Sequence, residues 1–177
     1  MDVVSRFLLH RDRLLLRLDE LLQQSADADE VAWILCEHTG RELNLANCVL
    51  YLPAGDDTLV QAAAWGPRRG AGRMPEARLR LSVGRGVVGD CARLLRTQRV
   101  DDTRLDTRYV HDGELGLSEL ATAISHDEIL LGVLDSEAVD AAFYDTRYEQ
   151  AFEAIAACGA AHLWRFRNAA VAGAGRR

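Results

Sequence analysis

Three acidic residues in the second half of the chain, Glu119, Asp135 and Glu137, lie in segments that otherwise resemble strands. Side chains alternate between the two faces of a strand, so Asp135 and Glu137 share one face while Leu134 lies on the other. Two interpretations stay open for each acid. It lies on a solvent-exposed strand face, or it projects into a polar site under the irregular segment 102–117.

That segment, 102–117, has no sustained hydrophobic period and several turn-forming residues, which is typical of a lid or binding loop. Its arginines carry planar guanidinium groups that suit a carboxylate or phosphate, and its tyrosine has an apolar ring with a polar tip. The candidate ligand-binding residues are therefore Arg104, Arg108, Tyr109, Ser118, Glu119 and Asp135. Alternatively, the charged residues pin the loop through their own salt bridges, an interpretation we prefer for Arg104 and Asp106.

Several other kinds of site are not predicted. None of the four cysteines belongs to a CxxC pair or has a histidine at zinc-ligand spacing, so we expect no metal site and interpret the cysteines as buried apolar residues in a reducing compartment. The glycines within 84–89 have the spacing GxGxxG, but GxxxxGK[ST] is absent and the hairpin-dominated strands predict no parallel βαβ unit around them, so we favour a tight turn before a helix over a nucleotide loop. No nucleophile elbow or HExxH motif is present.

The net charge and hydropathy limit the partners. A formal net charge of −6, with arginines interspersed among acids, argues against nucleic-acid binding. The chain has neither a signal-peptide pattern at its start nor an apolar run long enough to span a bilayer. We therefore expect a cytoplasmic protein that does not bind membranes.

Hydrophobic periodicity and turn residues predict the elements that position the candidate residues. In chain order they are a helix over 2–24, a helix from the Asp27–Glu30 capping box to about 43, strands 48–53, 59–65 and 78–81, a helix over 87–97, strand 99–101, strands 119–125 and 129–135, and a long helix over 146–171. Hairpin-dominated strands with helices at both ends of the chain indicate an α+β fold with a mostly antiparallel sheet. The apolar stripe of the first helix needs a packing partner.

Four motifs in register then carry a resemblance to a known family. They are Val83–Gly89, Asp101–Tyr109, Ser118–Ala121 and Leu131–Glu137. Their order and spacing resemble GAF domains, and with the flanking helices the resemblance covers about 25–165. It implies a six-stranded sheet with the terminal helices on one face and a loop or short helix over the other. We expect a helix for dimerisation or signalling over 1–24, a GAF-like domain over 25–171 and a flexible tail or linker over 172–177.

The resemblance also implies a function. GAF domains commonly bind a small molecule between the sheet and the loop above it and pass a signal to an output module through dimeric helices. We therefore expect a ligand-sensing regulatory domain that forms a homodimer through its terminal helices, with ligand and cofactor unidentified. The alternative is a dimerisation module without a ligand.

One enzymatic branch of this fold is similar to the free methionine-(R)-sulfoxide reductases, which carry a reactive cysteine in the loop before the Ser-Glu strand. The corresponding loop here, 109–117, contains no cysteine. Glu119 and Asp135 do match acids that bind substrate in that branch. On the missing cysteine, we expect a domain that is not an enzyme but keeps a polar pocket.

Overall fold

The computed structural model describes residues 3–66, 78–109 and 116–174. Its elements are α1 (Val3–Gln23), α2 (Ala28–Glu42), β1 (Cys48–Pro53), β2 (Thr58–Trp65), β3 (Arg80–Ser82), α3 (Gly86–Leu94), β4 (Gln98–Val100), β5 (Ser118–His126), β6 (Ile129–Ala138) and α4 (Thr146–Ala174). The predicted element order is confirmed, with shifts at several boundaries. The predicted loop residues 67–75 and 110–115 and the tail residues 175–177 lie outside the described residues.

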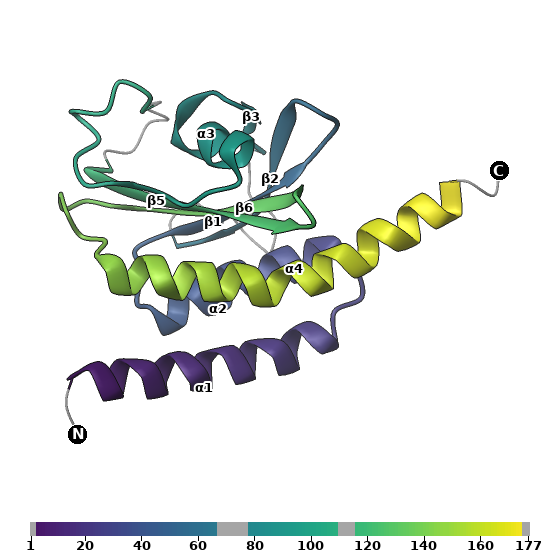
Figure 1. Cartoon of the computed structure of the whole chain (residues 1–177), viewed down its shortest axis with the longest axis horizontal. Coiled ribbons are helices and arrows are strands. Elements are labelled where there is room, and N and C mark those ends of the chain that lie inside the picture. The colour runs from purple at the N-terminus through teal and green to yellow at the C-terminus, as the bar shows by residue number, and fades with distance from the viewer. Residues whose placement is uncertain (1–2, 67–77, 110–115, 175–177) are drawn as a thin grey trace.

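The strands form one antiparallel sheet in the order β3-β2-β1-β6-β5-β4. Helices α1, α2 and α4 lie on one side of this sheet, and the short helix α3 lies on the other (Figure 1). The expected α+β, GAF-like architecture is confirmed. None of the described helices is long and apolar enough to cross a membrane.

The sheet separates two hydrophobic clusters because strand side chains alternate between its faces. The larger cluster joins α1, α2 and α4 to the sheet, with Phe152, Leu50 and Leu134 fully buried in it. The smaller cluster joins α3 to the opposite face and includes Val49 and Val133. Consecutive residues of β1 and β6 therefore pack into different clusters. Polar side chains can lie on the α3 face of the sheet without disturbing the larger cluster.

Helix α1 packs against its own chain. Leu14, Leu18 and Leu22 are at most 2% exposed and belong to the larger cluster, so α2 and α4 provide the partner that the apolar stripe requires. His162 Nε2 on α4 lies 3.1 Å from Asp19 Oδ1 on α1. The dimer through the terminal helices stays a prediction.

Helix α2 begins at the predicted capping box. The Glu30 backbone N–H donates to Asp27 Oδ1 at 2.8 Å, and the Ala26 backbone N–H donates to Glu30 Oε2 at 2.8 Å. These bonds satisfy backbone donors that the first helical turn leaves without an intrahelical partner. The local sequence signal therefore determines where α2 starts.

Candidate functional site

Three carboxylates meet on the α3 side of the sheet. Asp135 and Glu137 share one face of β6, and Glu119 projects from the neighbouring strand β5. All three residues are buried, with exposed fractions of 3%, 7% and 4% respectively. The interpretation of an exposed strand face is therefore wrong for these acids, and they line a pocket.

The strand register brings two of these acids directly opposite each other. Glu119 pairs with Glu137 across the β5–β6 ladder, and Ala121 pairs with Asp135. Directly opposite side chains have Cβ atoms about 5 Å apart, and like charges in such a pair are destabilising. A buried acidic pair lowers the stability of the fold, so these acids are better explained as part of a binding site than as packing residues.

Neighbouring groups hold Glu137 in place. The Tyr109 hydroxyl donates a 3.3 Å hydrogen bond to Glu137 Oε1, which links the irregular segment 102–117 to the acid cluster. The Glu137 backbone N–H donates to Asn47 Oδ1 at 2.9 Å. These contacts orient the end of β6 from two distant parts of the chain.

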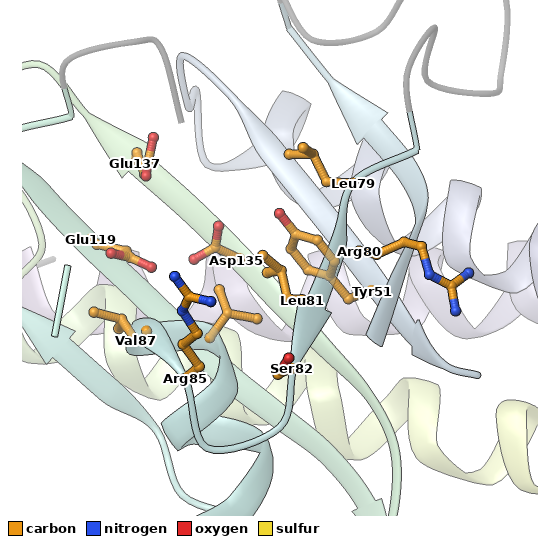
Figure 2. Close-up of a pocket in the computed structure, with 12 residues that line it drawn as sticks. Tyr51, Leu79, Arg80, Leu81, Ser82, Arg85, Val87, Glu119, Asp135 and Glu137 are labelled. Atoms are coloured by element: carbon orange, nitrogen blue, oxygen red, sulfur yellow. The ribbon is translucent and has the colours of Figure 1, made fainter. Parts of the chain in front are cut away.

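The opposite walls of the pocket are largely apolar. The cavity measures about 280 Å³. Tyr51 comes from the central strand β1, while the walls facing the acids come from β3 and from the start of α3 (Figure 2). These other lining residues are Leu79, Arg80, Leu81, Ser82, Arg85, Gly86, Val87 and Val88. A pocket that combines an acidic wall with apolar residues and two arginines can hold an amphipathic small molecule.

Helix α3 approaches β3 closely because of the glycines in its first turn. A Cβ on Gly89 would lie 2.4 Å from the Ser82 carbonyl oxygen. The Gly84 backbone N–H donates to the Gly89 carbonyl at 2.7 Å, and the positive φ of 82° at Gly84 is a conformation that favours glycine. The predicted tight turn is confirmed, and it places Arg85 at the mouth of the pocket.

The field of the acids extends into α3. Burial raises the pKa of the Cys91 thiol, and the negative charges of Asp135 and Glu119 raise it further. Cys91 is fully buried and, at neutral pH, is held as the neutral thiol. In the described part of the chain, no group of three His, Cys, Asp or Glu residues has a geometry that could hold a metal ion.

The two candidate arginines lie away from this pocket and pin their own segment. Arg104 donates from Nε and Nη2 to Asp102 at 2.8 and 2.6 Å. Arg108 donates in the same two-point manner to Asp106 at 3.0 and 2.7 Å. Arg108 also donates to Gln98 Oε1 at 2.9 Å. These contacts agree with the loop-pinning interpretation, and the guanidinium beside Asp106 lowers the pKa of that carboxyl.

The remaining candidates divide between the pocket and the scaffold. Glu119 and Asp135 line the pocket, and Tyr109 reaches it through Glu137. Ser118 is buried, and its hydroxyl donates to the Asp140 carbonyl at 2.8 Å.

The polar pocket residues that sequence reasoning omitted from the candidates include Glu137, Tyr51 and Arg85. Strand alternation already placed Glu137 beside Asp135, so a usable signal existed for it. No sequence signal identified Tyr51 or Arg85, because the pairing of β1 with β6 brings Tyr51 to the pocket and the glycine turn brings Arg85 there.

No family model and no curated protein matches the sequence. Among solved structures, the free methionine-R-sulfoxide reductase from Neisseria meningitidis in complex with its substrate aligns at a TM-score of 0.78 and 22% identity, over 96% of this chain and 95% of that one. The GAF domain of a phosphoenolpyruvate-protein phosphotransferase from Coxiella burnetii aligns at a TM-score of 0.78 and 18% identity, over 92% of this chain and 98% of that one. The reductase of Staphylococcus aureus in its reduced form aligns at a TM-score of 0.69 and 22% identity, over 86% of this chain and 94% of that one.

These comparisons correct one expectation and confirm another. The prediction that the chain is not an enzyme is contradicted, since free methionine-R-sulfoxide reductases are among the most similar structures and point to an enzyme. That prediction relied on one missing side chain in the loop 109–117, whereas the fold shared with those enzymes extends over most of the chain. The expected fold family is confirmed by several GAF domains of other proteins. The chain is therefore a GAF-like domain.

Proposed function

We propose that this GAF-like domain binds a small molecule with a protonated amine, of the free amino acid class, in the pocket between α3 and the sheet. The observation that carries the proposal is the convergence of Glu119, Asp135 and Glu137, all buried, on one wall of that pocket. Ligand binding is then the sensing step of a regulatory role, the function that GAF domains commonly have.

The charge balance of the pocket favours a cationic group. An ammonium donates three hydrogen bonds and carries a positive charge that carboxylates attract, and a hydrogen bond to a charged group contributes about 1.5–3 kcal/mol. Leu79, Leu81 and Val87 supply the apolar wall that the rest of an amino acid side chain requires. An anionic group placed against the acidic wall would instead meet three buried carboxylates.

The comparisons agree with this class of ligand. The similar reductase from Neisseria meningitidis is described in complex with its substrate, and its name states that it acts on free methionine-R-sulfoxide. That compound carries an ammonium group and an apolar chain with a polar sulfoxide. It is therefore the first probe for this pocket.

Calorimetric titration of the whole chain with L-methionine-(R)-sulfoxide and L-methionine tests the proposal. We expect binding that weakens at least tenfold in Glu119→Gln and in Asp135→Asn. The matched control is Asp56→Asn, which removes the same charge from an exposed turn. If no amino acid binds the folded chain, or if the two pocket variants bind like the control, the proposal is wrong and the module without a ligand becomes the better interpretation.

Reduction of the bound sulfoxide is a second candidate, favoured by the reductases among the similar structures. A thiol of the chain would take up the sulfoxide oxygen as a sulfenic acid and release the sulfide, and the dithiol reductant would then restore the thiol, releasing the oxygen as water and becoming a disulfide. The assay measures formation of free methionine with dithiothreitol as reductant. Activity that Cys91→Ala abolishes in a folded protein supports catalysis, and activity indistinguishable from dithiothreitol alone refutes it.

A further inference from the structure

Arg85 lies at the mouth of the acidic pocket, in the turn that leads into α3. Its backbone N–H donates to the Ser82 carbonyl at 3.1 Å, which fixes the turn. Figure 2 shows its side chain extending toward the carboxylates of Asp135 and Glu119, while the Arg80 side chain points away from them. A guanidinium therefore faces the acid cluster across the cavity.

The Arg85 side chain also differs from several arginines that lie outside the pocket. Arg93, Arg104 and Arg108 each form an ion pair with an aspartate close in sequence. Within residues 3–66, 78–109 and 116–174, the Arg85 side chain has no hydrogen bond or ion pair. Its planar donors remain available to a ligand in the cavity.

We propose that Arg85 is a specificity-determining residue that makes the pocket select amino acids over simple amines. This inference rests on the proposed function. The ammonium of a 2-amino acid would contact the acid cluster, and the carboxylate on the same carbon would face Arg85, which can bind it with two parallel hydrogen bonds. The side chain would lie along Val87, Leu79 and Leu81.

Arg85 is not expected to raise the affinity of the pocket for a simple amine. Such an amine presents no carboxylate to the guanidinium, and its positive charge lies close to that of Arg85. Removal of the guanidinium is therefore expected to weaken amino acid binding while leaving amine binding unchanged or tighter. A purely structural role for Arg85 would weaken both ligands together, so the ratio of the two affinities separates the explanations.

The experiment compares L-methionine-(R)-sulfoxide with its amine analogue 3-(methylsulfinyl)propan-1-amine by calorimetric titration. The variants are Arg85→Met, which keeps an unbranched stem without the charge, and Arg85→Lys, which keeps the charge without the two-point geometry. The matched control is Arg80→Met, which removes a charge from the same pocket rim where the side chain points away. Thermal melts verify that each variant is folded.

We expect Arg85→Met to lower the ratio of amino acid affinity to amine affinity at least tenfold, Arg85→Lys to restore part of it, and Arg80→Met to leave it within threefold. An unchanged ratio in Arg85→Met, or a change as large in Arg80→Met, overturns the inference. If the Arg85 inference fails but the amine binds the wild type and loses affinity in Glu119→Gln, the proposed function still stands. If neither ligand binds the wild type, both proposals fail.

Discussion

The acid cluster has a consequence for stability that can be measured without any ligand. Glu119 and Glu137 face each other across the β5–β6 ladder and are both nearly inaccessible to water. Directly opposite side chains in an antiparallel pair have Cβ atoms about 5 Å apart. Two unit charges at about 5.5 Å and an effective dielectric constant of about 20 repel by about 3 kcal/mol, an upper value because nearby donors reduce it.

Glu119→Gln removes this repulsion and keeps the shape of the side chain. We expect its free energy of unfolding at pH 7.5 to exceed that of the wild type by about 1–3 kcal/mol, a rise in Tm of several degrees for a domain of this size. The size of this difference depends on pH. When acid protonates one of the two carboxyl groups, the repulsion in the wild type is relieved and the difference between the two proteins shrinks.

Urea denaturation at pH 7.5 and pH 4.5, followed by circular dichroism, measures the difference at both charge states. Asp56→Asn is the control for the loss of one negative charge, since Asp56 is exposed in the β1–β2 turn. A Glu119→Gln protein that is less stable than the wild type at pH 7.5 would refute the reasoning. It would mean that hydrogen bonds to the Glu119 carboxylate outweigh its repulsion by Glu137.

Four further substitutions test the scaffold by equilibrium unfolding. Gly89→Ala brings a methyl group against the Ser82 carbonyl, so we expect a loss above 2 kcal/mol, and wild-type stability would contradict the close approach. Glu128→Gly relieves a positive φ of 60° in the β5–β6 turn and should add about 0.5–1 kcal/mol, whereas a loss would show that the glutamate contributes contacts there. Asp27→Ala removes the α2 cap and should cost about 1 kcal/mol; no cost would deny the cap a role. Leu18→Ala should cost about 2–5 kcal/mol, and a negligible effect would mean that α1 is not docked in solution.

The parts of the site that could be predicted are those encoded within one strand or one turn. Alternation along β6 already placed Asp135 and Glu137 on one side, and the capping box located the start of α2. The glycine spacing indicated the turn before α3. Each of these signals depends on neighbours a few residues apart, where backbone geometry leaves little choice.

The arginines of 101–109 show where such reasoning stops. A guanidinium binds a ligand carboxylate and a neighbouring aspartate by the same geometry, so residue type does not distinguish the two roles. In the structure Arg104 and Arg108 are each bound by the aspartate two positions before them. Arg85 has no acid so close in the chain and faces the cluster instead.

The sequence alone determined the order of helices and strands, the antiparallel hairpins and the side of β6 on which its acids lie, because these follow from backbone periodicity. Only the tertiary structure decided that Glu119 meets Glu137, that Tyr51 joins them through the pairing of β1 with β6, and that Arg85 lies across the cavity. Those contacts join segments far apart in the chain. Their register is set by how both faces of the sheet are buried at once, and no local pattern records it.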